Sequence, residues 1–317
     1  MGEQLDLFSA RPSTRLAVVP AAGGDDAPTP VAGTDAPIDL AGQMDLFGDR
    51  WLRAAAAHKA LETFDLDAAS IALCETVKLY PSDTGLAERA TRITELAAAL
   101  REATATTHSE AAALAAIELK VPPYLSNVWH LRLAAAIEHE PGATLDGCPA
   151  GLHYLRGGAL ERAEQSLRAS LAQDAFNART RAYLGDALFA LGRRANARIE
   201  YREALASDPS AVDLANLLDE AVRDLSDVAA IDHEVSGDPV EWIAAMGLIE
   251  GVFVRPLEPP PAWFDATAVD GAATGVRFYR WLVVEMAAKN GDERLAARRA
   301  MKALSPGLLK AVLARRG

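Results

Sequence analysis

Residues 178–209 read ARTRAYLGDALFALGRRANARIEYREALASDP, and this stretch decides the fold that we expect. Apolar residues recur at helical spacing on either side of Gly192, which predicts two amphipathic helices joined by a turn. Gly185 lets the second helix approach the first closely, and Tyr201 fills the groove between them. Pro209 ends the second helix. We expect the following residues to hold the pair together: Leu184, Gly185, Ala197, Tyr201, Ala204 and Pro209.

The same pattern also occurs directly before this stretch. Gly151 precedes Gly185 by 34 residues (185 − 151), and Gly158 precedes Gly192 by the same distance (192 − 158). Further residues repeat at this distance: Ala163 and Ala197, Leu171 and Leu205, and Asp174 and Asp208. Because Pro149 interrupts helical geometry, we expect the first helix of this looser copy to be short.

A 34-residue period is typical of the tetratricopeptide repeat, which residues 178–209 resemble at nearly every diagnostic position. Arg181 stands where that family often has Trp. The resemblance implies an all-α fold, built as a right-handed stack of antiparallel helix pairs (an α-solenoid) that binds another protein in its groove. We therefore expect Arg181, Tyr183 and Asp186, on the first helix, to line this groove.

We divide the chain into a disordered tail at 1–47, helical repeats at 48–234 and a C-terminal helical cap at 235–317. The tail is rich in Pro, Gly, Ala and Asp, a composition that buries too little apolar surface to fold. A further copy of the repeat is expected at 50–81. Other helices are expected at Leu86–Ala103, Ser109–Leu119, Tyr124–Glu140, Thr274–Lys289, Asp292–Leu304 and Pro306–Arg315, with Ser109 and Ser305 as caps and another helix starting at Asp238.

The tail contains nearly the same pentapeptide twice: Gln4, Leu5, Asp6, Leu7 and Phe8, and then Gln43, Met44, Asp45, Leu46 and Phe47. Adjacent large apolar side chains beside an amide can anchor a short peptide in a pocket. Both copies resemble the motif with which bacterial replication and repair proteins dock on the DNA sliding clamp, which implies that Leu7 and Phe8 fill the clamp's pocket. Two alternatives stay open: the first copy is a terminus without a role, and the second is a helix staple with Asp45 or Asp49 as the cap.

Charge and composition narrow the class of protein. The chain of 317 residues has a net charge of −12, so we do not expect it to bind nucleic acid directly. Residues 1–49 carry a net charge of −6 (2 bases, 8 acids) and residues 289–317 carry +6 (8 bases, 2 acids). The basic end could contact an acidic partner or nucleic acid, or form a solvated helix face. Few cysteines, no signal peptide and no bilayer-spanning run predict a cytoplasmic protein without a membrane segment.

Motifs for catalysis are scarce in this sequence. It has no phosphate-binding loop, no dinucleotide fingerprint and no His-Glu-x-x-His motif. His139, Cys148 and His153 lie close in sequence, and the alternative hypothesis is a metal-dependent enzyme that uses them. Their spacing fits no common zinc pattern, so we expect no metal, no cofactor and no catalytic residue. The sequence predicts a non-enzymatic adaptor, either docked on the sliding clamp or without that link.

Overall fold

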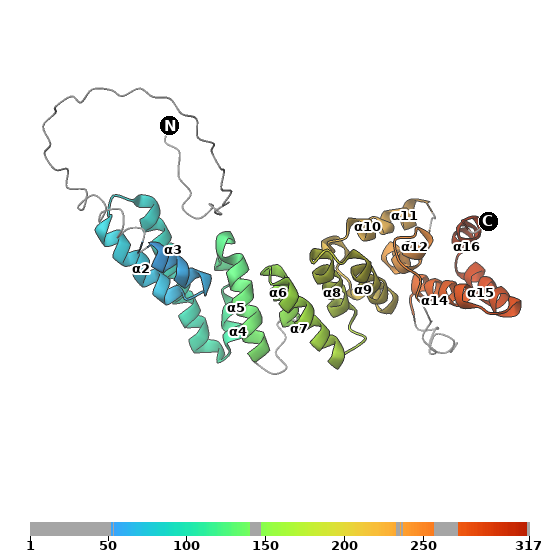
Figure 1. Ribbon diagram of the computed structural model, residues 1–317, viewed down its shortest axis with the longest axis horizontal. Coiled ribbons are helices and arrows are strands. Elements are labelled where there is room, and N and C mark those ends of the chain that lie inside the picture. The colour runs from blue at the N-terminus through green and yellow to red at the C-terminus, as the bar shows by residue number, and fades with distance from the viewer. Residues whose placement is uncertain are drawn as a thin grey trace, which may run out of the picture. The chain divides into compact units, whose positions relative to one another are not determined.

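The computed structural model describes residues 52, 54–139, 147–232, 235, 237–256 and 272–315 (Figure 1). Within these ranges every regular element is an α-helix or a short 3-10 helix, which confirms the all-α class. The tail expected at 1–47 lies outside the described residues. Both pentapeptides and the helix staple expected at Asp45 or Asp49 lie outside them too.

The first part of the chain is a succession of helices that begins with a helical segment at 54–62. It continues through α2 (Leu66–Leu79), α3 (Thr84–Thr107), α4 (Glu110–Ala116), η1 (Glu118–Lys120), η2 (Pro123–Leu125), α5 (Ser126–His139), α6 (Ala150–Arg156), α7 (Leu160–Gln173), α8 (Ala178–Ala190) and α9 (Arg194–Ser207). Neighbours in this order pack against one another from α2 to α9, and α6 also contacts α8.

The chain after α9 is less regular. It passes through η3 (Pro209–Ala211), η4 (Leu214–Asn216), α10 (Glu220–Arg223), α11 (Leu225–Asp232), η5 (Pro239–Trp242) and α12 (Ile243–Ile249), and then α14 (Thr274–Ala287), α15 (Gly291–Leu304) and α16 (Pro306–Ala314). Both α12 and α14 contact α9. Contacts therefore cross the expected boundary at 234/235, and residues 47–317 form one compact unit.

Side-chain caps explain where several of these helices begin. Ser109 accepts a hydrogen bond from the backbone N–H of Ala112 at 3.1 Å, and Ser305 accepts one from Leu308 at 3.2 Å. Both expected caps are confirmed, since each satisfies an orphan donor of the first turn. Asp238 caps its segment too, and the 3-10 helix η5 that begins there leads directly into an α-helix at Ile243–Ile249.

Two glycines set the spacing between paired helices. A Cβ atom on Gly185 would lie 2.5 Å from the ring of Tyr201, and one on Gly151 would lie 2.4 Å from Leu167. Each glycine in the first helix thus faces a side chain 16 residues later in the second (201 − 185; 167 − 151). The close approach expected at Gly185 is confirmed. Gly192 turns the chain with a φ of 78°, a left-handed conformation that suits glycine.

The helix pairs also have the expected short first helix and the expected buried residues. α6 has 7 residues and starts immediately after Pro149, so the short first helix is confirmed. Pro209 is buried and begins η3, two residues after α9 ends. The other residues expected to hold the pair are all buried: Leu184, Gly185, Ala197, Tyr201 and Ala204.

Candidate functional site

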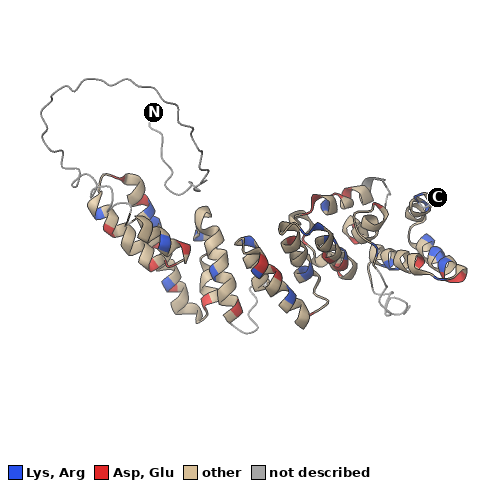
Figure 2. Cartoon of the chain, in the orientation of Figure 1, with Lys and Arg blue, Asp and Glu red and all other residues tan. Residues whose placement is uncertain are grey.

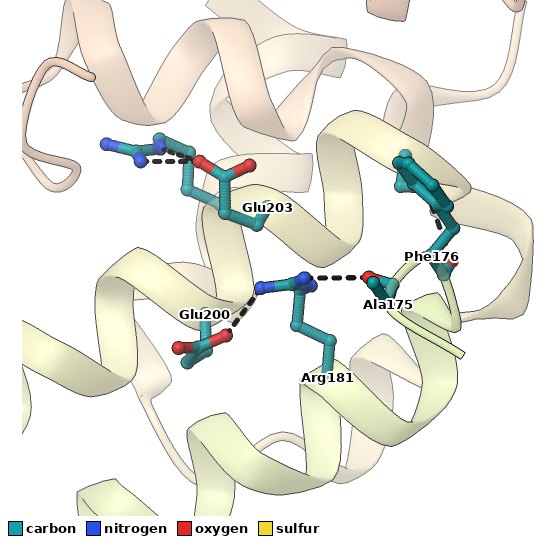
Figure 3. A network of polar contacts seen from close by, with 7 residues as sticks. Ala175, Phe176, Arg181, Glu200 and Glu203 are labelled. Atoms are coloured by element: carbon teal, nitrogen blue, oxygen red, sulfur yellow. Dashed lines mark hydrogen bonds and ion pairs between the residues drawn. The ribbon is translucent and has the colours of Figure 1, made fainter. Parts of the chain in front are cut away.

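Arg181, one of the residues expected to line the groove, has partners within the fold. Its guanidinium forms an ion pair with Glu200 of α9 at 2.9 Å and donates to the carbonyl of Ala175 at 2.8 Å (Figure 3). Figure 3 shows the side chain reaching between these two partners. Arg181 therefore links the turn between α7 and α8 to α9.

Asp186 is also occupied within the fold. It is buried, and its Oδ1 accepts from the Tyr201 hydroxyl at 2.6 Å and from the backbone N–H of Leu218 at 2.8 Å. Burial raises the pKa of Asp186 to about 6, although these two hydrogen bonds act in the opposite direction. The segment after α9 thus covers this end of α8, which corrects the expectation that Asp186 faces a partner.

Tyr183 is the third of the residues expected to line the groove. It is half-buried on α8, and burial followed by the neighbouring Cys148 raises its pKa. The positive charges of Arg179 and Arg156 act on the pKa of the same hydroxyl in the opposite direction. Arg179 lies one turn before Tyr183 on α8, and Arg156 ends α6, which contacts α8. We call Cys148, Arg156, Arg179 and Tyr183 the α6–α8 surface.

The two arginines of the α6–α8 surface are exposed. Among the described residues neither Arg156 nor Arg179 has an ion-pair partner, whereas Arg162, Arg168 and Arg181 all pair with glutamates. Within the described ranges, this place therefore carries two positive charges that have no ion-pair partner, beside an aromatic ring. Such a combination can bind a carboxylate and an apolar group together.

A buried histidine pair lies between α5 and α6, close to the same surface. The Nδ1 atoms of His130 and His153 are 3.2 Å apart, so one ring donates and the other accepts. The pKa of each histidine is lowered to about 4, mainly by burial and in part by the charge of Arg156. The pair is therefore neutral at pH 7. The Nε2 atom of His153 is buried and has no hydrogen-bond partner among the residues that the structure describes.

The three residues of the hypothetical metal site, His139, Cys148 and His153, are not arranged as metal ligands. His139 is exposed at the end of α5, whereas His153 is buried against His130. Across the described ranges no group of three or more His, Cys, Asp or Glu side chains is arranged to hold a metal ion. The structure therefore does not bring His139, Cys148 and His153 together as ligands.

Sequence reasoning missed most of the α6–α8 surface. Arg179 could have been found, because it precedes Tyr183 by four residues and so shares its helix face. Arg156 could not, because its position beside α8 depends on how α6 packs. The same holds for His130, whose partner is 23 residues away.

No protein-family model, no curated protein and no solved structure matches this chain. In the part of the chain that the structure describes, none of the helices combines the length and the apolar character needed to cross a bilayer.

Proposed function

We propose that this protein is a non-enzymatic, cytoplasmic scaffold that binds a protein partner at the α6–α8 surface. The observation that carries the proposal is the pair of exposed arginines, Arg156 and Arg179, which have no ion-pair partner in the described part of the chain, on contacting helices beside the half-buried Tyr183. Arg and Tyr are enriched at the energetic centres of protein interfaces, because both combine apolar contact with directed hydrogen bonds.

The arrangement of the helices supports a scaffold of the tetratricopeptide-repeat type. Paired helices follow one another along the chain, and a glycine–side-chain contact recurs 34 residues apart at Gly151 and Gly185. In such an α-solenoid each pair buries its apolar face only against its neighbours, which leaves a long surface for partners. We propose this architecture for residues 48–234, with 235–317 as its cap.

Site-specific photo-crosslinking tests the scaffold function. A photoreactive residue replaces Tyr183 in the full chain, and the matched control places it at Ile199, which is 39% exposed on α9. We expect crosslinks in a cell extract from position 183 that disappear when Arg156 and Arg179 are changed to Glu. Equal crosslinking from both positions, or crosslinks that survive the charge reversal, would contradict the proposal.

A second candidate function is docking on the bacterial sliding clamp, because both Gln4–Phe8 and Gln43–Phe47 resemble clamp-binding peptides. The adjacent Leu and Phe of each copy would supply the apolar anchor, and Gln would fix the register. This function places the scaffold at replicating or repaired DNA.

Binding of the full chain to a purified bacterial clamp tests this second function. We expect that Leu7→Ala with Phe8→Ala weakens binding, and that adding Leu46→Ala with Phe47→Ala abolishes it. The matched control changes Leu16 and Val18 to Ala, in the tail between the two copies. Unchanged binding in the quadruple variant would remove the clamp link and leave the scaffold function standing.

A further inference from the structure

The last helices of the chain have a charge opposite to that of the rest. Residues 272–315 contain nine bases and three acids, a net charge of +6 (9 − 3), so the remaining residues together carry −18 (−12 − 6). Figure 2 shows Lys and Arg gathered along α15. A basic region on an otherwise acidic chain can attract an acidic partner.

Two of these cations are neutralised within the fold. Arg298 pairs at 2.8 Å with Glu285, whose side chain is fully buried, and Arg315 pairs at 2.6 Å with Glu250. Both ion pairs hold helices together: the first joins α15 to α14, and the second joins the end of α16 to the end of α12. Their charges are therefore not available to a partner.

Four other cations are exposed and lack such a carboxylate. They are Arg294, Arg299, Lys302 and Lys310, none of which has an acidic partner among the described residues. Arg294 makes one long hydrogen bond to the carbonyl of Ala288, at 3.4 Å. The other three donate to no group in the described part of the chain, so their charges face solvent.

Exposed leucines accompany these charges. Leu295, Arg299 and Lys302 follow one another at i, i+4 and i+7 on α15, while Ala297 and Met301 form its buried side. Leu295 is 48% exposed, and on α16, which packs against α15, Leu313 is 40% exposed three residues after Lys310. We call Arg294, Leu295, Arg299, Lys302, Lys310 and Leu313 the α15–α16 surface.

We propose that the α15–α16 surface is a docking site for an acidic, amphipathic segment of another protein. The cations attract its carboxylates, and the exposed leucines bury its apolar side chains. Exposed ion pairs alone contribute little affinity, so the leucines supply the part of the binding that salt does not screen. A nucleic acid fits less well, because its phosphate backbone gains nothing from the exposed leucines, whereas an amphipathic segment buries apolar side chains against them.

Fluorescence anisotropy with the full chain tests this docking site. The probe is a labelled peptide with Leu at the a and d positions of each heptad and Glu elsewhere, and an unlabelled DNA duplex is the competitor. We expect Arg299→Glu with Lys302→Glu to weaken peptide binding about tenfold or more, because two attractions become repulsions. We expect Leu295→Ser to weaken binding at high salt as well as at low salt.

The matched control reverses two exposed cations elsewhere, Lys78 on α2 and Arg92 on α3, and changes the net charge by the same amount. Equal losses in the two double variants would show a general charge effect and overturn the proposal. Displacement of the peptide by duplex DNA at lower concentration would overturn it in favour of a nucleic-acid surface. Dimers of the wild-type chain in light scattering that are lost in Arg299→Glu with Lys302→Glu would make the occupant a second copy, and would also overturn it.

Discussion

At the scale of single residues, Gly185 sets the distance between α8 and α9. A Cβ at this position would meet the Tyr201 ring at 2.5 Å, and this ring cannot yield because it is fully buried with its hydroxyl bonded to Asp186. We expect Gly185→Ala to lower the free energy of unfolding by about 1–3 kcal/mol, despite alanine's better helix propensity. Gly291→Ala is the control, since a Cβ there meets nothing within 4 Å. Equal midpoints of urea unfolding for the two variants would contradict this reading.

The His130–His153 pair predicts a stability that depends on pH. The pKa of each histidine falls from 6.5 to about 4 on folding, so the unfolded chain takes up protons first as the pH drops. Stability from this pair is therefore complete above pH 6.5 and is lost as the pH falls towards 4. We expect the urea midpoint to be lower at pH 5 than at pH 7, and this difference to shrink when both histidines are changed to Leu.

The titration of Asp186 changes the stability of the fold in the opposite direction over the same pH range. Its pKa rises from 3.8 to about 6 on folding, so the folded chain keeps this proton longer and gains stability as the pH falls from 6 towards 3.8. The amide oxygen of Asn can accept the same two hydrogen bonds, but Asn does not titrate. We expect Asp186→Asn to lose more stability than the wild type between pH 7 and pH 5. An equal or smaller loss in the variant would contradict a raised pKa at Asp186.

At the scale of elements, Arg181 stabilises the packing of the α7–α8 turn against α9. Its ion pair with Glu200 is largely shielded, with 24% and 21% of the two side chains exposed, and the same guanidinium holds the Ala175 carbonyl. We expect Arg181→Ala to cost about 1–2 kcal/mol in chemical denaturation, because charge-assisted bonds are lost from a half-buried site. Arg101→Ala, which removes an exposed 3.6 Å pair with Asp67, should change little. Equal effects would contradict this role.

The sequence could predict those elements whose pattern is local. The α8–α9 pair follows from apolar spacing, Gly192 and Pro209, and α6 is short because Pro149 directly precedes it. Segment 209–219 could not be predicted in this way. It packs onto α8 through the bond between Leu218 and Asp186, 32 residues apart, and no periodicity marks such a contact. The same long-range contact explains why Asp186 is buried and not exposed.

At the scale of the whole molecule, the candidate sites differ in how far sequence predicts them. The cations of the α15–α16 surface lie within one short stretch, so their excess is visible in composition. The neutralisation of Arg315 by Glu250, 65 residues away, is visible only in the structure. The α6–α8 surface brings together residues from separate helices, and its charge becomes unusual only once the other arginines are seen to be paired.

The way the C-terminal helices join the preceding ones gives the last prediction. Both α12 and α14 contact α9, where Arg202, which is 5% exposed, donates to the carbonyl of Val254. Removing residues 235–317 would expose this side of α9 and take one hydrogen-bond acceptor from the buried guanidinium, which would keep only its ion pair with Glu203. We expect the chain 1–234 to melt at a lower temperature than the full chain and to bind more of a hydrophobic dye, because a stack without its cap exposes apolar surface. Removing residues 1–47 is the control and should leave the melting temperature unchanged. If the chain 1–234 instead melted at the temperature of the full chain, the C-terminal helices would be an independent domain.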